Sequence, residues 1–538
     1  MRKLFSALLL LSCASLFAQQ TFTQQDSLRG SITPERAWWD LNYYHLDIKV
    51  DPDAQTIAGT NTIRYKVTQP YQVLQVDLQP PMKIEKITQD GKKLKFNSNI
   101  NAHFVKLRKK QRVGDYNEIV VHYSGKPIIA KRPPWDGGLT WEKDGKGDHF
   151  FANSNQGIGS SVWWPNKDHP ADEVDSMAIS VEVPKNLMDV SNGRLRKVEE
   201  HENTKTYHWF VSNPINNYGV NINVADYAHF SEDYAGEKGN LTLDYYVLKE
   251  NLEKAKKQFN QALMTIKAFE YWFGPYPFYE DGFKLVEAPY LGMEHQSSVT
   301  YGNKYQNGYM GRDLSQTGRG LLFDFLIVHE SGHEWFANNI TDKDVADMWI
   351  HESFTAYSEN LFLDYHFGYN AACDYVLGTK ALVGNKRPII GQYNVNNRGD
   401  DIYYKGANML HTLRHLIEDD EKWRSILRGL NKDFYHQTVT TKQIEDYISN
   451  KSGIDLTEFF EQYLRTTMIP TLEYKQDGNS VAYRYTDIVS GFDMPVQIIS
   501  NNKKEWIYPT ATWKTLDKPF SMEQFEVDRN FYLETKKL

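Results

Sequence analysis

The sequence predicts a multidomain α+β protein: an N-terminal antiparallel β domain, a mostly helical domain and a small C-terminal β-sandwich. Three changes in the spacing of apolar residues predict this order. Apolar residues alternate with polar ones up to about residue 235, follow helical spacing from about 251 to 464, and alternate again after Pro470. A chain of 538 residues has room for three or four domains. We expect domain limits at 19–235, 236–466 and 467–538.

The composition excludes several classes of protein. With 41% hydrophobic and 24% charged residues, the chain can bury large cores. A formal net charge of −8 argues against a nucleic-acid partner, which usually needs a basic surface. No segment after the leader has the roughly 20 apolar residues that a membrane-spanning helix requires.

Residues 1–18 are expected to be a signal peptide. Arg2 and Lys3 precede an apolar run at 4–11, and small residues follow before Gln19. The protein is therefore expected to be exported, to the periplasm or the medium. An uncleaved membrane anchor and lipidation at Cys13 stay open as alternatives. Cys373 is the only other cysteine, so no intrachain disulfide is expected in the mature protein, and its side chain is expected to be buried as a small hydrophobe.

The N-terminal domain shows its strands by alternation. Apolar residues occupy every second position at 44–50, 63–67 and 74–78, which indicates an antiparallel sheet with one wet face. The stretch 132–157 is rich in Gly, Asp and Trp and is expected to be a long irregular loop, of the kind that often carries function.

Helices dominate the middle of the chain. Helical spacing from 251 ends at Gly274 and Pro275, and a short strand is expected at 283–288. Two further helices are predicted at 321–338 and 346–365. After these, alternation near 472–485 indicates the C-terminal β domain.

The first predicted helix carries His329-Glu330-Ser331-Gly332-His333. Residues four apart lie on one face of a helix, so both imidazoles can bind one zinc ion while the glutamate acts as a general base. Glu352 and Glu359, seven residues apart on the second helix, share a face. A catalytic zinc takes three protein ligands and leaves its fourth position to water, so Glu352 is the natural third ligand. Glu359 could then orient a ligand histidine through a hydrogen bond.

Residues 328–338 resemble the zinc helix of the aminopeptidase N / leukotriene hydrolase family of gluzincins. In that family the third ligand lies nineteen residues beyond the second histidine, which is the place of Glu352. Residues 349–354 resemble the family's Trp-Leu-Asn-Glu-Gly-Phe. The departures are Glu334 for Gln, Ala337 for Gly, His351 for Asn and Ser353 for Gly, and none of them removes a ligand.

The resemblance implies a thermolysin-like catalytic domain with one zinc ion per chain, and it assigns further residues. Residues 291–295 resemble the exopeptidase signature Gly-x-Met-Glu-Asn, so Gly292, Met293, Glu294 and His295 are expected at the substrate, with Glu294 binding the free α-amino group. His295 stands where the family has Asn and is expected to make the site a tuned or pH-sensitive variant. The segment 403–406 resembles Tyr-x-Lys-Gly.

The match of residues 403–406 with Tyr-x-Lys-Gly implies that Tyr403 stabilises the oxyanion. Gln156, before Trp163-Trp164-Pro165, resembles the glutamine that helps to hold the amine. The expected function is zinc-dependent removal of N-terminal residues from peptides with a free N-terminus, and oligomeric state stays open. The alternatives are epoxide hydrolysis, which one branch of the family performs, and an inactive relative that only binds. His149, His169, His411 and His415 are expected to be structural or exposed, not metal ligands.

Overall fold

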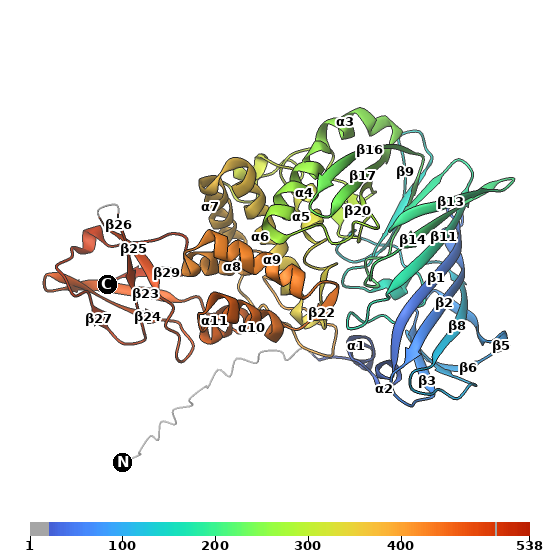
Figure 1. The fold of residues 1–538 in the computed structure, drawn as a ribbon, viewed down its shortest axis with the longest axis horizontal. Coiled ribbons are helices and arrows are strands. Elements are labelled where there is room, and N and C mark those ends of the chain that lie inside the picture. The colour runs from blue at the N-terminus through green and yellow to red at the C-terminus, as the bar shows by residue number, and fades with distance from the viewer. Residues whose placement is uncertain (1–20, 501–502) are drawn as a thin grey trace, which may run out of the picture.

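The computed structural model describes residues 21–500 and 503–538, so the expected leader and Cys13 lie outside the described residues. A β domain lies at each end of the molecule, with the helical domain between them (Figure 1). This confirms the multidomain α+β class and the predicted order of the domains. Within the described residues, no helix combines the length and apolarity needed to cross a bilayer.

The N-terminal domain is built on an eight-stranded sheet with the strand order β13-β14-β11-β1-β2-β8-β4-β5. Its pairs are antiparallel except β1 with β11, where Tyr43 lies opposite Ser176 in a parallel pair. The predicted alternation is visible in β1, whose inward residues include Leu46 and Ile48. The strands are β1 (Trp39–Asp51), β2 (Thr56–Val67), β4 (Lys83–Gln89), β5 (Lys92–Lys93), β8 (Tyr116–Gly125), β11 (Ser176–Pro184), β13 (Arg194–Glu200) and β14 (Thr204–Val211).

The stretch 132–157 is not one irregular loop. It contains the hairpin β9 (Gly138–Lys143) and β10 (His149–Ser154), which joins β15 (Ile222–Ala225) and β12 (Met188–Ser191) in a second sheet. The Gly- and Asp-rich composition hid two strands whose aromatic residues pack on each other, because the rings of Trp141 and Phe151 lie 4.4 Å apart. Two short helices, α1 (Gln24–Gly30) and α2 (Pro34–Ala37), and a small sheet of β3 (Val73–Asp77), β7 (Ala102–Lys106) and β6 (Lys95–Asn99) complete the domain.

The middle domain begins with a five-stranded sheet of order β16-β17-β18-β20-β19. The strands are β16 (Tyr227–Gly236), β17 (Gly239–Leu248), β18 (Phe283–Glu287), β19 (Gly292–Met293) and β20 (Val299–Tyr301). The expected domain limit at residue 235 therefore falls inside β16, and the change from one sheet to the next comes earlier, after Ala225. The predicted strand at 283–288 is β18.

Helix α6 forms the centre of the helical layer. Every residue from Trp349 to Leu363 is buried, and α6 packs against α4, α5, α7 and α8. Buried charged residues are rare, so the buried Glu352 and Glu359 on this helix mark a site that needs them. The helices are α3 (Leu252–Gln258), α4 (Asn260–Phe273), α5 (Phe325–Gly332), α6 (Trp349–Phe367), α7 (Tyr369–Gly378), α8 (Tyr404–Ile417), α9 (Asp420–Asp433), α10 (Thr441–Ser452) and α11 (Thr457–Arg465), with the short parallel pair β21 (Ile340–Asp342) and β22 (Gln437–Val439).

The C-terminal domain has two small sheets, as expected of a β-sandwich. One has the order β27-β24-β23-β29 and the other β26-β25-β28. Their inward residues, including Leu472 and Ile498, belong to the same core as the helices, so the sandwich is packed onto the middle domain. The strands are β23 (Thr471–Asp477), β24 (Ser480–Thr486), β25 (Val496–Ser500), β26 (Lys503–Ile507), β27 (Lys514–Thr515), β28 (Glu526–Val527) and β29 (Glu534–Lys537).

Candidate active site

Helix α5 is shorter than the predicted 321–338. It begins after Asp324, whose side chain caps the backbone N–H of Leu326 at 3.2 Å, and it ends at Gly332. A Cβ at Gly332 would lie 2.5 Å from Oγ of Ser358 on α6, so the glycine allows the two helices to approach closely. Beyond it the chain turns, and the N–H of Asn338 bonds to the carbonyl of His333. Sequence spacing missed this early end because the apolar pattern continues through the turn.

Both histidines of the motif are fixed by hydrogen bonds at Nδ1. His329 Nδ1 lies 2.7 Å from Oε1 of Glu359, and His333 Nδ1 lies 3.0 Å from the carbonyl oxygen of Phe336, which the turn after α5 presents to it. A partner at Nδ1 sets the tautomer and directs the lone pair of Nε2 to a metal. The two Nε2 atoms face the same carboxylate oxygen, Oε2 of Glu352, at 3.7 Å and 3.4 Å.

The site formed by His329, His333 and Glu352 fits a zinc ion. Their ligand atoms lie within 4.8 Å of one another. Oε2 of Glu352 is buried without a hydrogen-bond partner, which is unusual for a carboxylate oxygen unless a cation belongs there. Glu294, Glu330 and His333 satisfy the same distance criterion. We favour the first set because its two imidazoles both have partners at Nδ1, and two histidines with one glutamate are an established zinc ligand set.

Glu330 lies beside the ligands, in the wall of the cavity. Burial raises the pKa of its carboxyl to about 7. The strand β19 passes close to it: a Cβ at Gly292 would lie 2.6 Å from Cδ1 of Leu326 and 3.1 Å from Oε1 of Glu330. Gly292 thus leaves space for the glutamate, and Met293 follows it in the cavity wall.

Glu294 and Gln156 lie together in the cavity, although they come from different domains. Gln156 follows β10 of the N-terminal domain, and its Nε2 donates to Oε1 of Glu294 at 2.7 Å and to Oε1 of Glu352 at 3.0 Å. Glu294 is only 2% exposed, and this burial raises the pKa of its carboxyl. One amide therefore connects the candidate amine-binding carboxylate to the candidate metal ligand.

Tyr403 stands immediately before α8, with its hydroxyl donating to Oε1 of Glu352 at 3.0 Å. Its ring centroid lies 6.1 Å from that of His329. Burial holds the pKa of the phenol well above its usual value, so the hydroxyl stays protonated and can donate a hydrogen bond.

Three departures from the family pattern lie away from the ligands. The fully buried His295 does not line the cavity where it was expected to meet the substrate, and burial lowers its pKa to about 3, which disfavours the expected pH-sensitive role. The carboxylate of Glu334 accepts from the hydroxyl of Tyr276 and the N–H of Ser297, and His351 Nε2 accepts from the N–H of Asp342 at 2.7 Å. These side chains support the surrounding loops.

The candidate residues share one cavity of about 560 Å³. It contains Gln156, Gly292, Met293, Glu294, His329, Glu330, His333, Glu352 and Tyr403, but not His295. Three further side chains at the site were not predicted from the sequence. Trp135 and Arg398 line the cavity, and the hydroxyl of Tyr375 on α7 donates to Oε2 of Glu359. Nothing in their sequence context distinguishes them from other aromatic or basic residues.

Comparison with known proteins gives two family matches. Residues 41–218 match the model of the peptidase M1 N-terminal domain, and residues 257–463 match that of the peptidase family M1 domain. A protein of Saccharolobus solfataricus described as "Probable aminopeptidase 1" is 23% identical over 448 residues, covering 78% of this chain and 54% of the relative. Aminopeptidase B of Rattus norvegicus is 24% identical over 352 residues, covering 60% and 51%. The chain thus spans about half the length of these curated relatives.

Solved structures share the fold. The crystal structure of an M1 zinc metallopeptidase from Deinococcus radiodurans aligns with a TM-score of 0.69 at 19% identity, covering 81% of this chain and 95% of that one. A mutant of an M1 zinc metallopeptidase from the same organism, bound to the substrate Tyr-Ser-Ala, aligns with a TM-score of 0.66 at 20% identity, covering 81% and 96%.

Proposed function

Because the chain belongs to peptidase family M1, we propose that it is a zinc-dependent aminopeptidase that removes residues from the free amino terminus of peptides. The observation that carries the proposal is the buried Glu294, joined through Gln156 to the zinc ligand Glu352. A carboxylate held at this point can pair with a substrate ammonium group while the first peptide bond lies over the zinc site. Such an anchor makes an enzyme cut at the chain end.

Each residue has a definite part in this reaction. A zinc ion held by His329, His333 and Glu352 would polarise the scissile carbonyl and lower the pKa of the attacking water. Glu330 accepts the proton of that water and later donates it to the leaving amine. Tyr403 keeps its proton, so its hydroxyl can donate to the oxygen that becomes negative during the attack.

The cavity wall favours apolar or aromatic N-terminal side chains. Phe325 stacks on His329 with ring centroids 5.0 Å apart, and Tyr309 packs edge-on against Phe325 at 5.3 Å. Leu314 and Leu326 extend this wall. A substrate side chain that covers these rings would bury apolar surface, which is worth roughly 25 cal/mol per Å².

A hydrolysis panel tests the proposal. Purified zinc-loaded protein is assayed on chromogenic amides of leucine, phenylalanine and aspartate, each with a free and an N-acetylated amine. We expect chelator-sensitive cleavage of the free-amine set, fastest for the apolar residues. Glu294→Gln should lower the rate on free-amine substrates by about 10–100-fold, because a charge-assisted hydrogen bond is lost. It should leave N-acetylated substrates unaffected.

The same panel separates the alternatives. Equal losses on free and acetylated substrates in Glu294→Gln would remove the amine anchor from the proposal. A sample that holds one zinc per chain yet cleaves no amide would contradict the aminopeptidase assignment. Assays with an epoxide substrate, followed by product analysis, would then separate the two alternative functions. Hydrolysis of the epoxide would indicate an epoxide hydrolase, and no reaction would indicate a protein that only binds.

We also propose that the protein is exported. The support is the order of charged, apolar and small residues in positions 1–18. Intact-mass analysis of protein recovered from the periplasm or the medium should show a chain that begins near Gln19. A mass that includes the leader would refute cleavage, and a lipid adduct on Cys13 would establish the anchor instead.

A further inference from the structure

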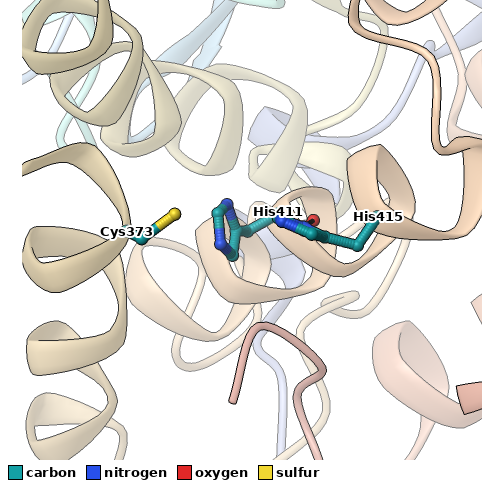
Figure 2. Close-up of side chains that lie close together, drawn as sticks. All are labelled: Cys373, His411 and His415. Atoms are coloured by element: carbon teal, nitrogen blue, oxygen red, sulfur yellow. Dashed lines mark hydrogen bonds between the residues drawn. The ribbon is translucent and has the colours of Figure 1, made fainter. Parts of the chain in front are cut away.

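A second cluster of metal-ligating side chains lies between α7 and α8, apart from the candidate active site. Cys373 on α7 faces His411 and His415, which follow each other by one turn of α8 (Figure 2). One ligand atom from each residue lies within 4.8 Å of those of the other two. All three side chains are buried: Cys373 and His411 are each 1% exposed, and His415 is 9% exposed. Both histidines were expected from the sequence to be structural or exposed.

The hydrogen bonds around His411 leave one of its ring nitrogens without a partner. Nε2 of His411 lies 3.0 Å from Oδ1 of Asn530, whose own amide nitrogen donates to Asp528 and so fixes which oxygen faces the histidine. Nε2 of His411 must therefore carry the proton. Nδ1 is then a lone-pair donor, and it is buried without any hydrogen-bond partner. An unpartnered buried nitrogen in a native structure calls for an explanation, and an absent ion is one.

His415 differs from His411, because both of its ring nitrogens have partners. Its Nδ1 donates to the carbonyl oxygen of His411 at 2.8 Å, and its Nε2 accepts from the hydroxyl of Tyr369 at 2.6 Å. A metal ion at this Nε2 would take the place of the Tyr369 hydroxyl. Carbonyl partners on the N–H of each imidazole are the usual supports of metal-binding histidines.

We propose that Cys373, His411 and His415 form a second metal site, which binds a thiophilic ion and favours Cu(I). One thiolate and two imidazoles are the ligands that Cu(I) and Zn(II) accept. Binding releases the thiol proton, and the sulfur then bonds to the ion. The neighbouring Arg414 is already paired with Asp364 and Asp420. A monovalent ion with one thiolate adds no net charge to this buried place, whereas a divalent ion adds one positive charge, which burial disfavours.

The site would hold three parts of the molecule together. Its ligands come from α7 and α8, and Asn530, which supports His411, belongs to the C-terminal domain. A metal ion at this point would therefore act as a structural clamp, and its binding would stabilise the folded chain.

Metal titration of the full chain tests the proposal, with Cys13→Ser as the parent so that Cys373 is its only thiol. In the first arm, the zinc-loaded parent competes for Cu(I) with a chromogenic chelator under anaerobic conditions. We expect the parent to take one more equivalent of Cu(I) from the chelator than the double variant Cys13→Ser/Cys373→Ser takes. Binding of this Cu(I) should also raise the thermal stability of the parent. In the second arm, apo protein is titrated with Co(II) and scanned for thiolate-to-cobalt charge-transfer absorbance. The catalytic ligands include no sulfur, so only Cys373 can give this band.

Matched controls accompany both arms. His411→Gln and His415→Gln should lose the extra equivalent, whereas His366→Gln, which removes a histidine bonded only to a backbone carbonyl, should retain it. Amide hydrolysis by the Cys373→Ser protein should stay unchanged, which shows that the variant folds. A cobalt band without copper uptake would support the site but assign it to a divalent ion. Equal copper uptake with and without Cys373, together with no cobalt band, would overturn the proposal.

Discussion

Two helices of this protein each carry a pair of histidines four residues apart, and the two pairs have different surroundings. On α5, His329 and His333 meet Glu352 at the wall of a cavity of about 560 Å³. On α8, His411 and His415 meet Cys373 in the packed core, where all three side chains are buried. An open position beside the ligands is what catalysis requires, while a closed ligand set is typical of structural sites.

The residues next to the ligands differ as well. In the open site the first histidine is followed by Glu330 and bonded to the carboxylate of Glu359. In the closed site the equivalent positions are Thr412 and the neutral amide of Asn530. The spacing of the histidines thus defines a place for a metal, and the neighbouring carboxylates distinguish catalysis from structure.

The largest effect is expected from the residue that follows the first histidine. Glu330→Gln should lower kcat by about 10²–10⁴-fold, because the amide cannot accept the proton of the attacking water. Bound zinc, measured by elemental analysis, should stay at one per chain. The counterpart Thr412→Val should keep its rate and lose about 1 kcal/mol of unfolding free energy, because the Thr412 hydroxyl bonds to the N–H of Tyr532. A zinc-loaded Glu330→Gln enzyme with the wild-type rate would contradict the role of Glu330.

A smaller effect is expected from the partner of the ligand histidine. Glu359→Gln should weaken zinc binding by roughly 10–100-fold, because the carboxylate that orients His329 is replaced by a neutral amide. Competition with a zinc chelator measures this. Tyr375→Phe removes only the hydrogen bond behind Glu359 and should change the affinity less. Unchanged zinc affinity in Glu359→Gln would show that the carboxylate has no influence on the metal.

The smallest effect is expected from the backbone beside the open site. Gly292→Ala would place a methyl group against Leu326 and Oε1 of Glu330, and shifting that carboxylate should lower kcat by about tenfold. Steady-state kinetics would measure this loss. Gly384→Ala, at a glycine whose added Cβ would meet only contacts near 4 Å, should leave the rate unchanged. A Gly292→Ala enzyme as fast as this control would mean that the position of Glu330 tolerates more movement than its packing indicates.

The sequence predicted the parts of this structure that regular spacing or short motifs encode. The alternation at 44–50 became β1, and the seven-residue interval between Glu352 and Glu359 placed both carboxylates on the face of α6 that meets the histidines. Long-range packing was not predictable. The end of α5 depends on the approach of Ser358 to Gly332, and the support of Glu359 by Tyr375 depends on how α7 packs on α6. The full burial of His295 likewise follows from long-range packing, which no local pattern reveals.

The amide of Gln156 shows how the two larger domains contribute to substrate recognition and to zinc binding. All three candidate zinc ligands belong to the catalytic domain, whereas the amide that connects Glu294 to Glu352 is contributed by the N-terminal domain. Recognition of the substrate's amino terminus therefore involves both domains, whereas zinc binding involves the catalytic domain alone. Chimeras that exchange N-terminal domains between relatives should keep their zinc content and change their ratio of free-amine to blocked-substrate hydrolysis. Exchange of the N-terminal domain could then change the substrate preference of such an enzyme while its metal centre stays the same.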